Sequence, residues 1–271
     1  MLNSIRSKQY FTIGAIVLLV AFLFTRDIKG LVKPKEENGK APVAGGSMAP
    51  QQEASINLAQ VSAAAKNSIN ANLADEINAL EDSFRTATDK AAAAKVLAEK
   101  WDDLEQTVPS ALYLEILANN EKTLKNWLAA GDKFSKAFDN TRDSLLQPAL
   151  LQKANTSYTN ALALDSTNVD AKTGLGITIV NGMGMPMQGI AMLLDVVKKD
   201  PKNLKANMSL GTFAIKSGQF DKAITRFNDI IAIKPSPDAY FYLGTAYENL
   251  GKNAEAIQAF TESKKLAANP T

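Results

Sequence analysis

The C-terminal part of the chain repeats one pattern of apolar, small and turn-forming residues. Leu210-Gly211 returns as Leu243-Gly244, 33 residues later. Apolar residues within each copy recur at three- and four-residue steps, which predicts helices rather than strands. A period of this length is typical of arrays of helix pairs, in which no pair can bury its apolar face alone. The other recurring pairs are Gly218 and Gly251, Ala223 and Ala256, and Phe227 and Phe260.

Each recurring residue has a physical role in such a pair. The Leu-Gly glycine and the alanine let neighbouring helices approach closely, and the phenylalanine fills the space between successive pairs. Gly218 and Gly251 are expected to end the first helix in a left-handed conformation. Pro201 and Pro235 are expected to end the second helix and to set the turn to the next unit.

The same pattern continues upstream in a weaker form, so residues 121–271 are predicted to form four units. Their expected bounds are about 124–166, 169–202, 204–236 and 237–270. The first unit carries an insertion of about 11 residues, which includes Asp139 to Pro148. The second has a methionine-rich turn, Asn181 to Met187.

This arrangement resembles the tetratricopeptide repeat family from about Leu124 to the C-terminus. Trp127, Ala130, Gly131 and Phe134 follow the family frame W-x2-L-G-x2-Y, with Ala in place of Leu. The resemblance implies an all-α fold, a right-handed superhelix whose first helices line a concave groove for a peptide or partner helix. The groove positions that it implies are Leu128, Asp132, Thr173, Ile177, Val180, Asn181, Lys205, Met208, Thr212, Ile215, Lys216, Phe241, Thr245, Glu248 and Asn249.

Three further substitutions depart from the family pattern. Lys172 and Asn207 stand where the first aromatic residue is expected, and Ser263 replaces an alanine. The groove also lacks the clusters of Lys and Arg that clamp a carboxylate in some members of the family. Recognition of an acidic C-terminal tail is therefore not expected.

Residues 55–120 also have a helical pattern, with Ile69, Leu73, Ile77 and Leu80 at three- and four-residue steps. We expect three helices that cap or extend the array. Pro109 is expected at the start of one of them, because proline suits a first helical turn. These N-terminal helices are also an alternative occupant of the groove, into which they would fold back.

A segment without charged residues, Gln9–Thr25, follows a short N-terminal tail of residues 1–8. Seventeen helical residues span about 25 Å, the short end of what crosses a bilayer. We interpret the segment as a single transmembrane anchor. The alternatives are a cleaved signal peptide, for which no small-x-small site follows Phe24, and a buried core helix. Residues 26–54 are rich in Gly, Pro and charge, which predicts a flexible linker.

Flanking charge alone would keep the C-terminal side in the cytoplasm, but long domains translocate largely regardless of it. We therefore expect a single-pass protein of the bacterial inner membrane, with its repeat domain in the periplasm.

Composition narrows the possible chemistry. The chain has no cysteine and no histidine, which excludes disulfides, thiolate zinc sites, thiol nucleophiles and histidine acid–base catalysis. Residues 41–271 carry a net charge of −2, so nucleic-acid binding is not expected. The alternating Met183, Met185 and Met187 leave two readings open, a soft Cu(I) site or packing and partner contact. We expect no enzymatic activity and no cofactor.

The sequence therefore predicts a membrane-anchored scaffold or co-chaperone that binds a protein partner through the concave face of the array. The alternative is a structural subunit of a larger envelope or translocon-associated complex. That subunit would make its contacts through the convex face or the terminal helix, Ala254 to Ala268, which is also where a homo-oligomer would form.

Overall fold

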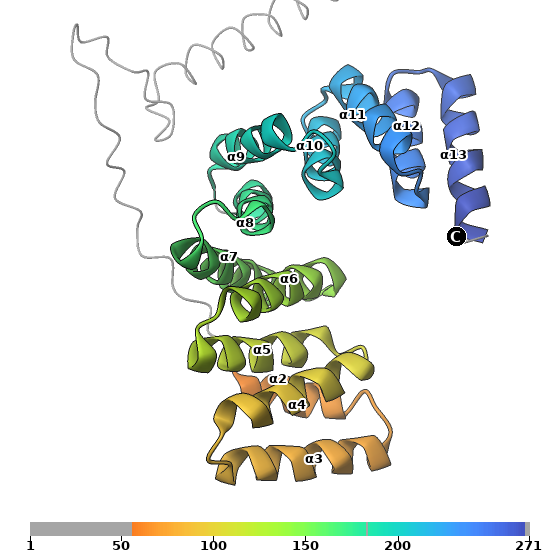
Figure 1. Ribbon diagram of the computed structural model, residues 1–271. Helices are drawn as coiled ribbons and strands as arrows, with labels where there is room; N and C mark the ends of the chain where they lie inside the picture. Colours follow the sequence, from red (N-terminus) through yellow and green to blue (C-terminus); the bar gives the residue numbers. More distant parts are fainter. Residues whose placement is uncertain (1–55, 183, 269–271) are drawn as a thin grey trace, which may run out of the picture. The chain divides into compact units, whose positions relative to one another are not determined.

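The structure is a computed structural model that describes residues 56–182 and 184–268. Within these residues the chain forms twelve α-helices and no strand, which confirms the all-α prediction (Figure 1). None of the helices in these two ranges is long and apolar enough to cross a bilayer. The predicted tail 1–8, anchor 9–25 and linker 26–54 lie outside the described residues.

The helices fall into an N-terminal group and a repeat group. The N-terminal group is α2 (Leu58–Lys66), α3 (Ala71–Thr86), α4 (Lys90–Asp103) and α5 (Thr107–Glu121). The repeat group is α6 (Leu124–Asn140), α7 (Gln147–Leu164), α8 (Val169–Gly182), α9 (Pro186–Lys199), α10 (Leu204–Lys216), α11 (Phe220–Ile233), α12 (Pro237–Asn249) and α13 (Asn253–Ala268).

The prediction of three helices in residues 55–120 is wrong, because the N-terminal group has four. The extra boundary lies between α2 and α3, where the Asn70 side chain accepts a hydrogen bond from the backbone N–H of Leu73. An asparagine that satisfies this N–H starts a new helix. Pro109 lies in the first turn of α5, as expected.

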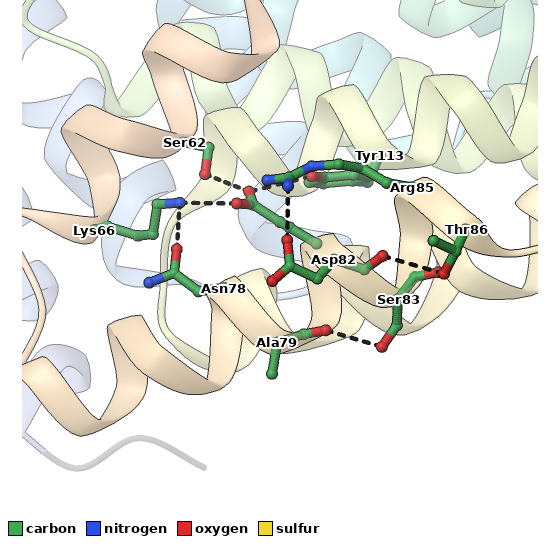
Figure 2. Close-up of polar contacts among 10 residues, drawn as sticks. Ser62, Lys66, Asn78, Ala79, Asp82, Ser83, Arg85, Thr86 and Tyr113 are labelled. Atoms are coloured by element: carbon green, nitrogen blue, oxygen red, sulfur yellow. Dashed lines mark hydrogen bonds and ion pairs between the residues drawn. The ribbon is translucent and has the colours of Figure 1, made fainter.

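A buried carboxylate ties α2 and α5 to α3. Glu81 accepts hydrogen bonds from the Ser62 hydroxyl, from Lys66 Nζ at 2.8 Å and from the Tyr113 hydroxyl at 3.3 Å (Figure 2). Burial by itself raises the pKa of Glu81, but the hydrogen bonds and the charge of Lys66 outweigh it and hold the pKa below its ordinary value. The ionised carboxylate therefore helps to fix the position of α2.

The repeat residues pack as their spacing predicted. A Cβ atom built on Gly211 would lie 2.7 Å from the ring of Phe227, and one on Gly244 would lie 2.7 Å from Phe260. Neither position has room for a larger side chain. Gly218 and Gly251 have φ values of +72° and +71°, which confirms their left-handed conformation after α10 and α12.

The first two units are joined by Tyr158 of α7, whose ring lies between Gly131 of α6 and Gly174 of α8. A Cβ atom on Gly131 would lie 2.7 Å from the ring, and one on Gly174 would lie 2.3 Å from it. Tyr158 is fully buried. Two glycines from successive first helices thus form the slot for one aromatic ring.

The insertion in the first unit lengthens its helices. α6 has 17 residues and α7 has 18, against 13 in α10 and 14 in α11. Asp139 therefore lies in the last turn of α6 and Pro148 in the first turn of α7, and both helices are longer than those of the regular third unit.

The missing aromatic residue in the third unit has a polar replacement. Asn207 is buried and donates hydrogen bonds to the backbone carbonyls of Pro201 and Asn203, both at 3.0 Å. Its side-chain oxygen accepts a hydrogen bond from Arg226 on α11 at 2.9 Å. Because every polar atom of the amide is satisfied, the asparagine can occupy an interior position.

Candidate functional site

A groove of about 520 Å³ lies along the first helices of the four units. α6, α8, α10 and α12 each contribute to it, and successive members of this series contact one another. Residues of α2 to α5 are absent from its lining, so the described N-terminal helices do not fill it. Nine of the fifteen predicted positions line the groove: Ile177, Asn181, Lys205, Met208, Thr212, Ile215, Lys216, Phe241 and Thr245.

Two predicted positions on α8 face the interior instead. Thr173 is only 1% exposed, and its hydroxyl donates to the carbonyl of Val169 at 2.8 Å. Val180 packs toward α9, where a Cβ atom on Gly189 would lie 2.7 Å from its side chain. The prediction that these two side chains lie on the groove surface is therefore wrong. The groove-facing side of α8 is formed by Gly174, Ile177 and Asn181.

Four further predicted positions lie outside the groove lining. Leu128 is half-buried and packs against two core clusters. Glu248 and Asn249 are exposed near the end of α12, where Asn249 donates to the carbonyl of Thr245. Asp132 is about half-exposed and contacts a groove residue, Lys205, through an ion pair.

The lining also includes residues that the sequence did not single out. Asp139 adds a charge, Ser209 a hydroxyl and Tyr242 a ring, and the buried Tyr158 and Gly174 lie directly beneath the lining. Asp139 lies in the inserted part of the first unit, for which the repeat pattern gives no register. Asp139 lies one turn beyond Ser135 on α6, and Ser135 also lines the groove. This spacing is the signal that could have placed Asp139 in the groove.

The apolar part of the lining is centred on α12. Phe241 is 50% exposed, and its ring lies 5.7 Å from that of Phe260 and 5.5 Å from that of Tyr242, measured between centroids. Met208 and Ile215 of α10 are half-buried and pack against the core cluster that contains Phe227 and Leu243. A large aromatic ring held by its neighbours but left half in water is a surface suited to a partner's apolar side chain.

A cluster of polar groups beside the groove links two units that are not neighbours. Lys205 Nζ on α10 donates to Asp132 Oδ1 on α6 at 2.8 Å, across 73 residues of sequence. The Tyr158 hydroxyl donates to the same oxygen at 2.8 Å and lies 3.2 Å from the Ser135 hydroxyl. Burial, followed by the negative charge of Asp132, raises the pKa of the Tyr158 hydroxyl, which remains protonated as a donor.

Two further charged residues line the groove, Asp139 on α6 and Lys216 on α10. The surrounding walls remove water from Asp139 and so raise the pKa of its carboxyl, while the charges of Lys205 and Lys216 oppose that shift. In the described part of the chain, neither Asp139 nor Lys216 makes an ion pair within 4.0 Å. The groove lining therefore has two opposite charges that are not joined.

Metal binding finds no support in the described residues. Among them, no group of three or more His, Cys, Asp or Glu side chains is arranged to hold a metal ion. Met185 and Met187 are 46% and 72% exposed, so these two methionines do not pack into a core, and Met183 lies outside the described residues. What the groove offers is an apolar surface bordered by charges, which is suited to binding.

The architecture is thus that of a helical-repeat array with a concave groove. The sequence model of the tetratricopeptide repeat family matches residues 210–270, which cover the third unit from its Leu-Gly pair onward and the fourth. No curated protein matches this chain.

Among solved structures, "MamA 41-end from Desulfovibrio magneticus RS-1" is similar, with a TM-score of 0.50 and 17% identity over 68% of this chain and 98% of that one. A second similar structure, "Crystal structure of MamA protein", has a TM-score of 0.47 and 20% identity over 68% and 98% of the two chains. The Desulfovibrio magneticus structure supports the fold alone. Together with the family match over residues 210–270, it supports a helical-repeat fold of tetratricopeptide type for the repeat group.

Proposed function

We propose that this chain is a membrane-anchored, non-catalytic scaffold or co-chaperone that binds a protein segment in its concave groove. The observation that carries the proposal is Phe241, half-exposed in an apolar lining contributed by three successive first helices. In a soluble domain an exposed apolar cluster of this kind is typical of an interaction surface.

The energy available at Phe241 is large enough to matter. A buried aromatic side chain covers about 150–250 Å², of which half is still exposed here. Removing about 100 Å² from water at about 25 cal/mol per Å² contributes about 2.5 kcal/mol. A contribution of that size is characteristic of the residues that dominate protein interfaces.

Site-specific crosslinking tests the groove. A photoreactive residue placed at Ile215 or Phe241 in the full chain is expected to trap a protein, whereas the same residue at the exposed position Ile257 on α13 is not. Trapping only segments of the protein's own chain at the groove positions would refute the proposal, and so would equal trapping at all three sites.

The location proposed for the domain is the periplasmic side of a bacterial inner membrane, with Gln9–Thr25 as the single anchor. The support is the length and uncharged character of that segment and the charged linker that follows it. A pair of C-terminal fusions, one to alkaline phosphatase and one to a fluorescent reporter that matures only in the cytoplasm, tests the orientation. Activity of the second reporter alone would reverse it.

One observation favours the alternative, a structural subunit that uses its terminal helix. Ile257 on α13 is 67% exposed, and Leu250 at the preceding turn is 37% exposed. If this end carries the contacts, Ile257→Glu will abolish co-purification or self-association while Phe241→Asp leaves both unchanged. The opposite pattern supports the groove. Sedimentation of the two variants in detergent distinguishes a second copy from a different partner.

A further inference from the structure

We propose that the groove selects its partner segment by charge polarity. The segment would carry a basic side chain that faces Asp139 on α6 and an acidic side chain that faces Lys216 on α10. It would also carry an apolar residue between them against Ile177 on α8, and a further apolar residue against Phe241 on α12. The inference rests on the proposed function and names the chemistry of the partner.

The two walls of the groove carry opposite charges. Asp132, Ser135 and Asp139 are spaced at i, i+3 and i+7 along α6, which places them on one face of that helix. Lys205 and Lys216 are eleven residues apart on α10, three turns, and also share a face. Both lysines line the groove, as do Ser135 and Asp139. An acidic wall thus borders the groove on the α6 side and a basic wall on the α10 side.

One charge on each wall is already paired. Lys205 and Asp132 form the 2.8 Å ion pair, and the Tyr158 hydroxyl adds a second donor to the carboxylate. Asp139 and Lys216, in contrast, make no ion pair within 4.0 Å to any of the described residues. These two groove-lining charges are therefore available to a partner.

The position of Asp139 is unfavourable for the fold alone. It is the next-to-last residue of α6, where the helix dipole disfavours a carboxylate, and the groove walls withdraw water from it. A cation from outside would relieve both effects. Lys216 is the last residue of α10, where a positive charge suits the helix dipole, and its amine remains available to a carboxylate.

The lining beside these two charges is largely apolar. Ile177 on α8 and Ile215 on α10 line the groove together with Phe241 on α12. Lys205 is paired with Asp132 at the edge of the groove, and the charges of Asp139 and Lys216 sum to zero, so no unpaired net charge favours a uniformly acidic or basic segment. Recognition must then depend on the order of charges in the partner.

Selection from a phage-displayed library of random dodecapeptides on the full chain, held in detergent micelles, tests the polarity. Peptides that bind the protein but not its Phe241→Asp variant are expected to combine Lys or Arg on one side of an apolar residue with Asp or Glu on the other. Asp139→Asn should lose the basic preference and Lys216→Gln the acidic one. The matched controls Asp229→Asn and Lys264→Gln, at exposed positions outside the groove, should retain both.

Affinity measurements on one selected peptide complete the test. Replacing its basic residue with Gln should weaken binding to the native chain about three- to fivefold, but should not weaken binding to Asp139→Asn any further. Peptides that depend on Phe241 yet show the same charges with and without Asp139 and Lys216 would overturn the polarity and leave the proposed function standing. If no peptide depends on Phe241, the proposed function fails, and this inference fails with it.

Discussion

Replacing Gly174 with alanine tests the packing that joins α6, α7 and α8. The new Cβ atom would lie 2.3–2.6 Å from three atoms of the Tyr158 ring, whereas ordinary contacts are 3.4–4 Å. The ring would have to move by about 1 Å. Two contacts oppose this movement: Gly131 lies on the other side of the ring, and Asp132 accepts a hydrogen bond from its hydroxyl.

The magnitude follows from three opposing effects. Overpacking a core of this kind costs about 1–3 kcal/mol. Disturbing the Tyr158–Asp132 hydrogen bond costs about 1 kcal/mol more, a low value because Asp132 is half-exposed. Alanine in place of glycine in a helix returns about 1 kcal/mol. The expected net loss is about 2 kcal/mol, which lowers Tm by about 4–8 °C in a chain of this size.

The loss in free energy of unfolding can be measured by urea and thermal unfolding of the full chain. Circular dichroism at about 222 nm follows both transitions. Gly176→Ala is a graded control, since its Cβ atom would meet Leu193 at 3.0 Å and the neighbour need move only slightly. Its stability should change by less than about 1 kcal/mol. In a Tyr158→Leu background the cost of Gly174→Ala should disappear. A native-like or higher stability of the single Gly174→Ala variant would refute the reasoning.

Three further substitutions have definite expected outcomes. Phe227→Ala, at a fully buried ring, should cost about 3–5 kcal/mol in urea unfolding. The folded-state pKa of Glu81 lies below its ordinary value of 4.5, so its ionised form stabilises the fold above that pH and the contribution is lost as the pH falls below it. Glu81→Gln should therefore flatten the loss of stability between about pH 5 and 3. Asp139→Asn should raise stability at neutral pH by about 0.3–1 kcal/mol while weakening peptide binding, and a loss of stability would contradict the placement of its charge.

The repeat residues were predictable because their roles are fixed by local geometry. A glycine that faces a phenylalanine across two helices, as Gly211 faces Phe227, recurs wherever that close approach recurs. The 33-residue spacing therefore located the helix pairs, their turns and most of the groove wall. Lys205 and Phe241 were correctly placed on the groove because their units are regular.

The remaining differences arise where units are irregular or contacts are distant in sequence. Thr173 and Val180 belong to α8, whose groove-facing side is Gly174, Ile177 and Asn181 and so differs from what the regular units suggest. Asp139 falls in an insertion, outside any repeat register. The slot around Tyr158 requires glycines from two units, and no local pattern reports such a combination.

The ion pair between Asp132 and Lys205 has a consequence for how the array can change in length. In an ordinary repeat array an added pair of helices leaves every other contact intact, because each unit touches only its neighbours. Here an extra pair inserted anywhere between α7 and α10 would carry Lys205 away from Asp132 and break their ion pair, while the Tyr158–Asp132 hydrogen bond within the first unit would remain. The ion pair therefore fixes the number of helix pairs between Asp132 and Lys205. At the C-terminal end, units can be added by duplication without breaking this ion pair.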